Sequence, residues 1–163
     1  NRVGDLDAEA LPYAVKTLGI SVEEAQNQLT KQSGLLGVSG ISNDVRDIAD
    51  AASKGNANAK LALDVFVASA RHWIGSYFLQ LNGADAIVFT AGTGENQSNI
   101  RAAICANLEN LGVKLDAAKN NSTRATEAII SAADSAVKIF VIPTNEELVV
   151  AREAKRYLEN LKN

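Results

Sequence analysis

Apolar and polar positions follow helical periodicity over the first half of the chain. This spacing predicts a helix from about residue 7 to 18 with Asp7 as its N-cap. Ser21 and Glu24 have the spacing of a capping box, which predicts a second helix to about Gln32. A long periodic segment predicts a third helix over residues 58–81, ended by Gly83.

Short runs rich in β-branched residues predict strands in the second half. Residues 86–90 and 137–142 are typical of buried parallel strands, and residues 112–116 and 127–131 are weaker candidates. Helices are predicted over residues 100–110 and 145–161, with a polar loop over 120–123. Alternation of strands and helices indicates the α/β class with a parallel component.

Two glycine-rich segments interrupt this pattern. Residues 33–42 predict a buried loop, followed by a helix to about Ala52 with Ser42 or Asn43 as its cap. Residues 91–96 follow the strand at 86–90 and predict a turn into a helix. Ligands in α/β folds bind beyond the carboxyl ends of strands, where glycines let the backbone approach them. A tight turn without a ligand explains the second segment equally well.

Charged side chains near these segments are further candidates, each with a structural alternative. Arg46 beside Asp44 suits a polar ligand or an ordinary helix-end ion pair. Arg2, before a Gly-Asp turn, suits a phosphate clamp or an idle chain end.

Thr144 and Glu147 have capping-box spacing, so Glu147 has a structural role. Glu146 lacks that role, which leaves it as a cation ligand or as a solvated acid in the first helical turn.

Composition narrows the classes of partner. The 16 Lys and Arg residues against 19 Asp and Glu give a formal net charge of −3, and no basic block stands out. We therefore expect no nucleic-acid partner and no membrane partner.

The single cysteine, Cys105, excludes an internal disulfide and favours a cytoplasmic location. His72 is the only histidine, which excludes a multi-histidine metal site. The chain lacks Met and opens on Asn1, so we expect a piece of a longer protein.

Three segments together resemble acetate kinases: residues 33–48, residues 86–96 followed by Arg101, and residues 141–148. They occur in that family's order and at its spacing, and the resemblance covers essentially the whole chain. It implies that residues 1–163 are the C-terminal nucleotide-binding part of a two-domain kinase whose N-terminal part is absent. The implied fold is part of an actin/Hsp70-like (ribonuclease H-like) domain, helix-rich with a small parallel-containing sheet.

The resemblance also implies an activity: phosphoryl transfer between ATP and acetate, giving acetyl phosphate and ADP. Propionate kinase or another short-chain acyl kinase is one alternative, and a non-catalytic nucleotide-binding or assembly module is another. The implied cofactors are ATP/ADP and Mg²⁺. The implied partners are a short-chain carboxylate, the missing N-terminal half and a second copy in a homodimer of the full-length protein.

Individual residues carry the family's roles by position. The family's nucleotide-contacting residues match Asp44, Val45, Arg46, Gly92, Thr93, Gly94, Glu95 and Asn96, with Thr93 in place of the usual Ile. Glu146 matches the magnesium-associated Glu. Arg2 matches an Arg held to stabilise the transition state, although Asn1 and Val3 replace its usual neighbours. The family's phosphate loop, acyl pocket, catalytic Asp and active-site His residues lie upstream, so the chain alone is expected to be inactive.

Overall fold

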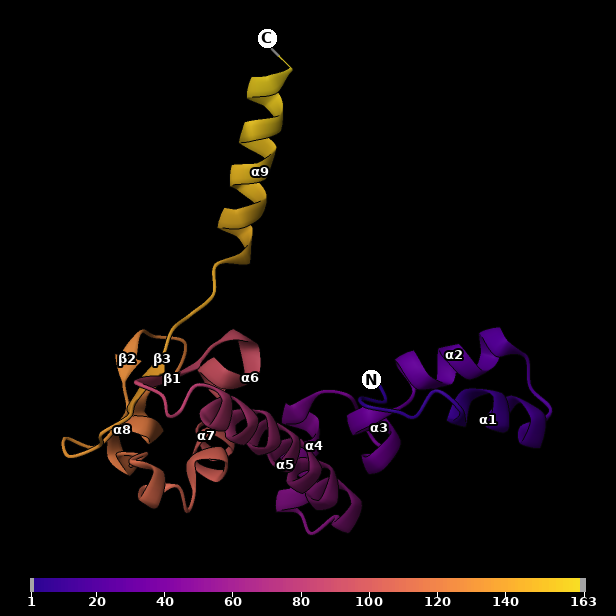
Figure 1. Ribbon diagram of the computed structural model, residues 1–163, viewed down its shortest axis with the longest axis horizontal. Coiled ribbons are helices and arrows are strands. Elements are labelled where there is room, and N and C mark those ends of the chain that lie inside the picture. Colours follow the sequence, from indigo (N-terminus) through magenta and orange to yellow (C-terminus); the bar gives the residue numbers. More distant parts are fainter. Residues whose placement is uncertain (1, 162–163) are drawn as a thin grey trace. The chain divides into compact units, whose positions relative to one another are not determined.

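The computed structural model describes residues 2–161 and divides the chain into two compact units (Figure 1). The N-terminal unit is Asn1–Ile74 and the C-terminal unit is Gly75–Asn163. The boundary falls within the long helix α5 (Ala57–Gln80). The bounds of α5 confirm the helix predicted over residues 58–81. Each unit is described by itself.

Helices alone make up the regular structure of the N-terminal unit among its described residues. Before α5 they are α1 (Ala10–Leu18), α2 (Val22–Lys31), α3 (Gly34–Ser39) and α4 (Val45–Ser53). The Glu24 N–H donates to Ser21 Oγ at 3.1 Å, which confirms the predicted cap of α2.

The predicted N-cap at Asp7 is wrong, because α1 begins at Ala10. Asp7 instead accepts a bond from the Glu9 N–H at 2.9 Å, in the turn before the helix. Pro12 explains the later start. It has no N–H, so it is tolerated in the first helical turn but not one turn further in.

Most of the glycine-rich segment 33–42 is helical, as α3 spans Gly34–Ser39, which corrects the predicted buried loop for those residues. Gly40, with φ of 66°, ends α3 and donates its N–H to Leu36 O at 2.8 Å. Only Gly37 lies well inside the helix, where a Cβ would come 3.1 Å from Gln32 O. Glycines at the ends of a helix bound it rather than break it. The cap of α4 is Asp44, not Ser42 or Asn43.

The core of the N-terminal unit lies where α4 meets the start of α5. Ile48, Ala59 and Ala62 are fully buried there, and partly buried apolar side chains of α3, α4 and α5 pack against them. Small alanines let two helices approach closely, so a modest set of side chains closes this core.

A three-stranded sheet organises the C-terminal unit (Figure 1). The central strand β3 (Lys138–Val141) pairs in parallel with β1 (Ala86–Phe89) and antiparallel with β2 (Ala128–Ile129). These strands confirm three of the four predicted runs, and residues 112–116 form only isolated bridges. Around the sheet lie α6 (Ala91–Asn96), α7 (Ser98–Cys105), the 3₁₀ helix η1 (Glu109–Leu111), α8 (Ala117–Ser122) and α9 (Glu146–Asn160). The polar loop predicted over 120–123 is therefore mostly the end of α8.

Burial of β1 differs from the prediction. Phe89 is buried, but Ala86 and Val88 are exposed, Val88 by 49%. Among the described residues β1 is an edge strand of the sheet. An edge strand covered on one face only leaves alternate side chains in solvent, so its apolar composition overstated its burial. Cys105, on α7, is buried.

Across residues 2–161, no helix combines the length and the apolar character needed to cross a membrane.

Candidate functional site

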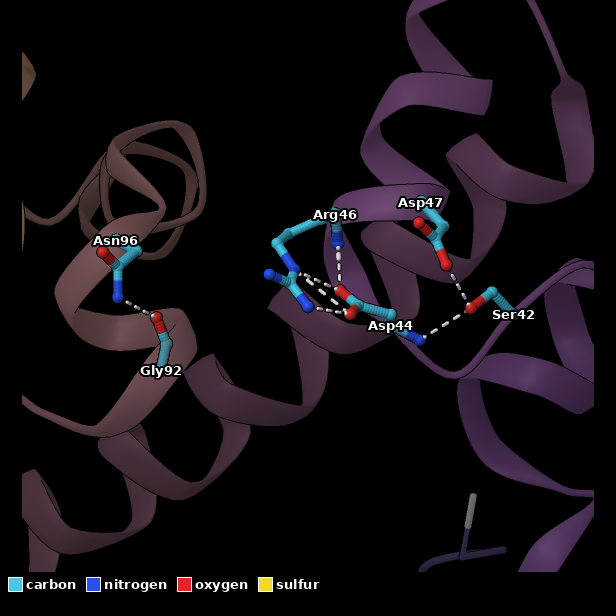
Figure 2. Close-up of polar contacts among 6 residues, drawn as sticks. All are labelled: Ser42, Asp44, Arg46, Asp47, Gly92 and Asn96. Carbon is cyan, nitrogen blue, oxygen red and sulfur yellow. Dashed lines mark hydrogen bonds and ion pairs between the residues drawn. The ribbon is translucent and has the colours of Figure 1, made fainter.

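The segment after β1 is a short helix, which corrects the predicted glycine-rich turn. Ala91, with φ of 59°, turns the chain out of the strand and into α6. Gly94 packs against the end of β1, and a Cβ there would come 3.2 Å from the Phe89 carbonyl carbon. Gly92 has no neighbouring atom within 4 Å of that position, so the first turn of α6 is open to an incoming group. The Asn96 side-chain amide donates to Gly92 O at 2.9 Å and closes the turn (Figure 2).

Arg101 anchors the end of α6 from beneath. Its side chain is fully buried, and its Nη1 donates to Gly94 O at 2.9 Å and to Glu95 O at 3.0 Å. Nε donates to Asn120 Oδ1, and Nη2 donates to Asn120 O and Thr123 O, each at 2.8 Å. Burial lowers the pKa of this guanidinium from its ordinary value. The buried Arg101 side chain therefore links the end of α6 to α8 and its C-cap, by donating to carbonyl groups of both.

Glu95, also in α6, hydrogen-bonds to the segment that follows the end of β3. Its side chain is 8% exposed, and Oε1 accepts bonds from the Thr144 N–H at 2.9 Å and from Thr144 Oγ1 at 3.1 Å. Thr144 is therefore not the N-cap of α9. Asn145 is the cap, and its Oδ1 accepts from the Leu148 N–H at 2.9 Å. The capping-box role predicted for Glu147 is accordingly wrong.

Glu146 opens α9 and is exposed. Its carboxylate makes no hydrogen bond or ion pair within the described part of the chain, so its oxygens are available to a ligand. Glu147 follows it in the same first turn. Residues 2–161 contain no cluster of three or more His, Cys, Asp or Glu side chains able to hold a metal. Any cation here would take one or two protein carboxylates and the rest of its ligands from elsewhere.

In the N-terminal unit, Asp44 and Arg46 form a hydrogen-bonded ion pair at the start of α4 (Figure 2). Asp44 Oδ1 accepts from the Arg46 N–H at 2.8 Å, and the two carboxylate oxygens accept from Arg46 Nε and Nη2 at 2.5–3.1 Å. Bonds from the Arg46 side chain, and then from its backbone N–H, lower the pKa of Asp44 to about 2. The Arg46 side chain is 77% exposed. Ser42 Oγ steadies the turn by donating to Asp47 and accepting from the Asp44 N–H.

The other two candidate residues of this unit, Val45 and Arg2, differ from Asp44 and Arg46 in their surroundings. Val45 is buried at the start of α4, so its side chain packs inside the unit rather than facing a ligand. Arg2 is exposed and lines a cavity of about 660 Å³, together with its neighbours Val3 and Gly4, residues 32–33, and parts of α3 and α5. The Val3 N–H donates to Leu29 O at 2.8 Å and holds this segment in place. Asn1 lies outside the described residues. His72 meets the ring of Trp73 edge-on at 5.5 Å.

The predicted residues thus fall into separate groups. Arg2, Asp44, Val45 and Arg46 belong to the N-terminal unit, while residues 92–96 and Glu146 belong to the C-terminal unit. Inside the C-terminal unit, the Glu95–Thr144 contact brings the loop and the Glu146 segment together. Sequence reasoning missed this contact and the anchoring by Arg101. The sequence signal for Arg101 was its place after residues 86–96 in the segment that resembles acetate kinases.

Comparison with known proteins supplies the family. The model of the acetokinase family matches residues 1–152. This chain belongs to the acetokinase family. An acetate kinase of Syntrophomonas wolfei is 51% identical over 152 residues, which cover 93% of this chain and 38% of the relative. The chain therefore spans about 38% of the length of the curated relatives it matches.

Solved structures of the family agree. The acetate kinase of Porphyromonas gingivalis superposes with a TM-score of 0.87 at 36% identity, covering 96% of this chain and 39% of that chain. A propionate kinase of Francisella tularensis superposes with a TM-score of 0.83 at 43% identity, covering 93% and 38%. The fold is the α/β actin/Hsp70-like type with a small mixed sheet, as the resemblance implied.

Proposed function

We propose that this chain is the nucleotide-binding part of a kinase that transfers a phosphoryl group between ATP and acetate or another short-chain carboxylate. The observation that carries the proposal is the short helix α6, residues 91–96, which occupies the position of the family's nucleotide loop. Arg101 and Glu95 hold it from two sides, while the first turn at Gly92 stays open. A backbone loop fixed before the ligand arrives binds without a further ordering cost.

The acceptor is the less specific part of the proposal. Relatives with these segments include proteins named acetate kinase and one named propionate kinase. Both acceptors are short carboxylates, and the open turn at Gly92 does not contact the acceptor in our proposal. We therefore assign the class of acceptor rather than its chain length.

Glu146 fits a magnesium ligand. Its carboxylate is exposed and without a bonding partner in the described chain, and Mg²⁺ prefers oxygen ligands. Mg²⁺ in kinases is held through one or two carboxylates together with substrate phosphates and water. A single acidic residue at the start of α9 is sufficient for that kind of site. The ion would neutralise phosphate charge, and the role of Glu146 is to hold it.

Arg46 and Arg2 are proposed to act on the nucleotide and on the transferred group respectively. The Asp44 carboxylate accepts bonds from Nε and Nη2 of Arg46 and so orients the guanidinium plane. Such a plane suits stacking on a base or bonding to a phosphate. Arg2 is exposed at the mouth of a cavity, and its fork matches the equatorial oxygens of a phosphoryl group. Both assignments rest on the match to the family segments.

A cytoplasmic location and a homodimer of the full-length protein complete the proposal. The single buried Cys105 needs no oxidising compartment, which supports the location. The family resemblance supports the dimer, and sedimentation of the full-length protein tests it.

The test compares two neighbouring carboxylates in the full-length protein, by trapping acetyl phosphate as hydroxamate. Glu146→Gln should lower turnover and raise the Mg²⁺ concentration needed for half-maximal rate. Glu147→Gln removes the same charge one residue later and is the matched control, because it has no capping role. Equal effects of the two substitutions on the Mg²⁺ requirement would contradict the assignment of Glu146. Absence of phosphoryl transfer to acetate and propionate by the unaltered protein would contradict the function.

A further inference from the structure

Glu95 stands in the nucleotide loop, yet its carboxylate is buried and bonded to Thr144. We propose that Glu95 is a positioning residue that sets the location of Glu146, so that loop and cation ligand are held as one unit. This inference rests on the proposed function. It assigns to Glu95 a role toward the protein rather than a direct contact with the nucleotide.

Because β1 and β3 pair in parallel, the segments that follow them, α6 and residues 142–146, leave the sheet at the same end. Phe89 and Val141 are paired at the same end of the sheet, and the Ile142 N–H still donates to Phe89 O at 2.9 Å. Beyond that point the two chains separate, one into α6 and the other toward α9. In the described part of the chain, the bonds from Thr144 to Glu95 are the hydrogen bonds that join α6 to residues 142–146.

Packing does not replace these bonds at the start of α9. No residue of α9 is buried, so side-chain burial within this chain does not hold the helix in place. Glu146 lies two residues after Thr144, a separation of at most about 7 Å along the backbone. A shift of Thr144 therefore passes directly to the carboxylate of Glu146.

The chemistry of the contact is suited to positioning. One carboxylate oxygen accepts both the backbone N–H and the hydroxyl of the same residue, which fixes the backbone and the side chain of Thr144 together. Bonds to a charged acceptor are about twice as strong as neutral ones. Because Glu95 is 8% exposed, solvent competes little for this oxygen.

The experiment uses the full-length protein with three variants and a matched control. Glu95→Ala removes the acceptor, Glu95→Gln keeps an acceptor oxygen without the charge, and Thr144→Val removes only the hydroxyl donor. Ser135→Ala is the control, because Ser135 is 4% exposed and its Oγ donates to Val137 O at 2.6 Å, away from this contact. Two readouts are needed: hydrogen exchange of the Thr144 amide without nucleotide, and the Mg²⁺ requirement with ATP.

We expect Glu95→Ala to accelerate exchange of the Thr144 amide and to raise the Mg²⁺ requirement, each by about tenfold or more. Glu95→Gln should change both readouts by about threefold, less than Glu95→Ala, because the amide oxygen accepts the same two bonds without the charge that strengthens them. Thr144→Val should raise the Mg²⁺ requirement by about threefold. Ser135→Ala should lower the melting temperature and leave both readouts unchanged.

Several results would overturn the inference. One is a Glu95→Ala protein that melts earlier, as Ser135→Ala does, with unchanged amide exchange and Mg²⁺ requirement. Another is a Glu95→Gln protein as impaired as Glu95→Ala, since the charge rather than the bond to Thr144 would then matter. If Glu95→Ala does not fold, an unchanged Mg²⁺ requirement in Thr144→Val overturns it. Absence of kinase activity in the unaltered protein would instead refute the proposed function, and amide exchange would still decide whether Glu95 holds Thr144.

Discussion

Replacing Arg101 by Met removes the donor that holds the end of α6. The guanidinium makes five hydrogen bonds, to the carbonyl oxygens of Gly94, Glu95, Asn120 and Thr123 and to Asn120 Oδ1. Met fills much of the same volume but donates no bond. Four of the five acceptors are backbone groups, so no second substitution can remove them.

The magnitude follows from what the lost donor leaves behind. A buried acceptor without a partner costs about 1–3 kcal/mol. Met also avoids the cost of burying a charge, which offsets several kcal/mol of the gross loss. The Asn120 carbonyl keeps a weak bond from the Thr123 N–H at 3.3 Å. We therefore expect a net loss of about 3–5 kcal/mol in the free energy of unfolding of the C-terminal unit.

Urea unfolding of the chain followed by circular dichroism measures this loss. Arg124→Met is the matched control, because Arg124 is exposed and its Nε donates only a long, 3.4 Å bond to Asn96 Oδ1 within the described part of the chain. That variant should stay within about 0.5 kcal/mol of the unaltered chain. Arg101→Lys should lose nearly as much as Arg101→Met, since one ammonium group cannot reach acceptors on both α6 and α8. A loss below about 1 kcal/mol in Arg101→Met would refute the reasoning that this network supports the loop.

Three further predictions concern charge, activity and assembly. Because Arg46 lowers the pKa of Asp44 to about 2, the stability that Asp44 contributes should be present above pH of about 4 and lost as the pH falls toward 2. Urea unfolding at several pH values should show a smaller acid loss in Asp44→Asn, and an equal loss would contradict this. The chain alone should give no acetyl phosphate in the hydroxamate assay, and turnover within tenfold of a full-length enzyme would show that other residues carry the reaction. Finally, β1 is an edge strand with Val88 49% exposed, and Ile129 on the opposite edge is 52% exposed, so the chain should self-associate or melt at low temperature. Sedimentation over a wide concentration range would contradict this if it found a monomer throughout with a sharp, high-temperature melt.

Local signals in the sequence located most of the regular elements. Ser21 caps α2 because its hydroxyl reaches the Glu24 N–H three residues on, a contact that needs no tertiary partner. The long periodicity of α5 and the β-branched runs of β1 and β3 likewise express preferences within a few residues. The three segments that resemble acetate kinases could also be identified from the sequence, because each is a continuous run of residues.

Local signals were misleading where glycines or capping residues had a distant partner. The segments at 34–39 and 91–96 looked like loops because glycine weakens helices in isolation. Gly94, however, lies where a Cβ would come 3.2 Å from the carbonyl carbon of Phe89, so glycine suits this close approach. Thr144 had the spacing of a cap, but its hydroxyl bonds to Glu95, 49 residues earlier, and Asn145 caps the helix instead.

The sequence by itself therefore determined the segments whose helical or strand preference is local, such as α2, α5, β1 and β3, and which family the chain resembles. Only the tertiary structure decided what supports the candidate site. Arg101 had no local feature that marks it as buried, because its five bonds run to residues 6 to 22 positions away. Burying a guanidinium is favourable only when all these acceptors converge on it, and that convergence exists only once α6, α7 and α8 are packed together.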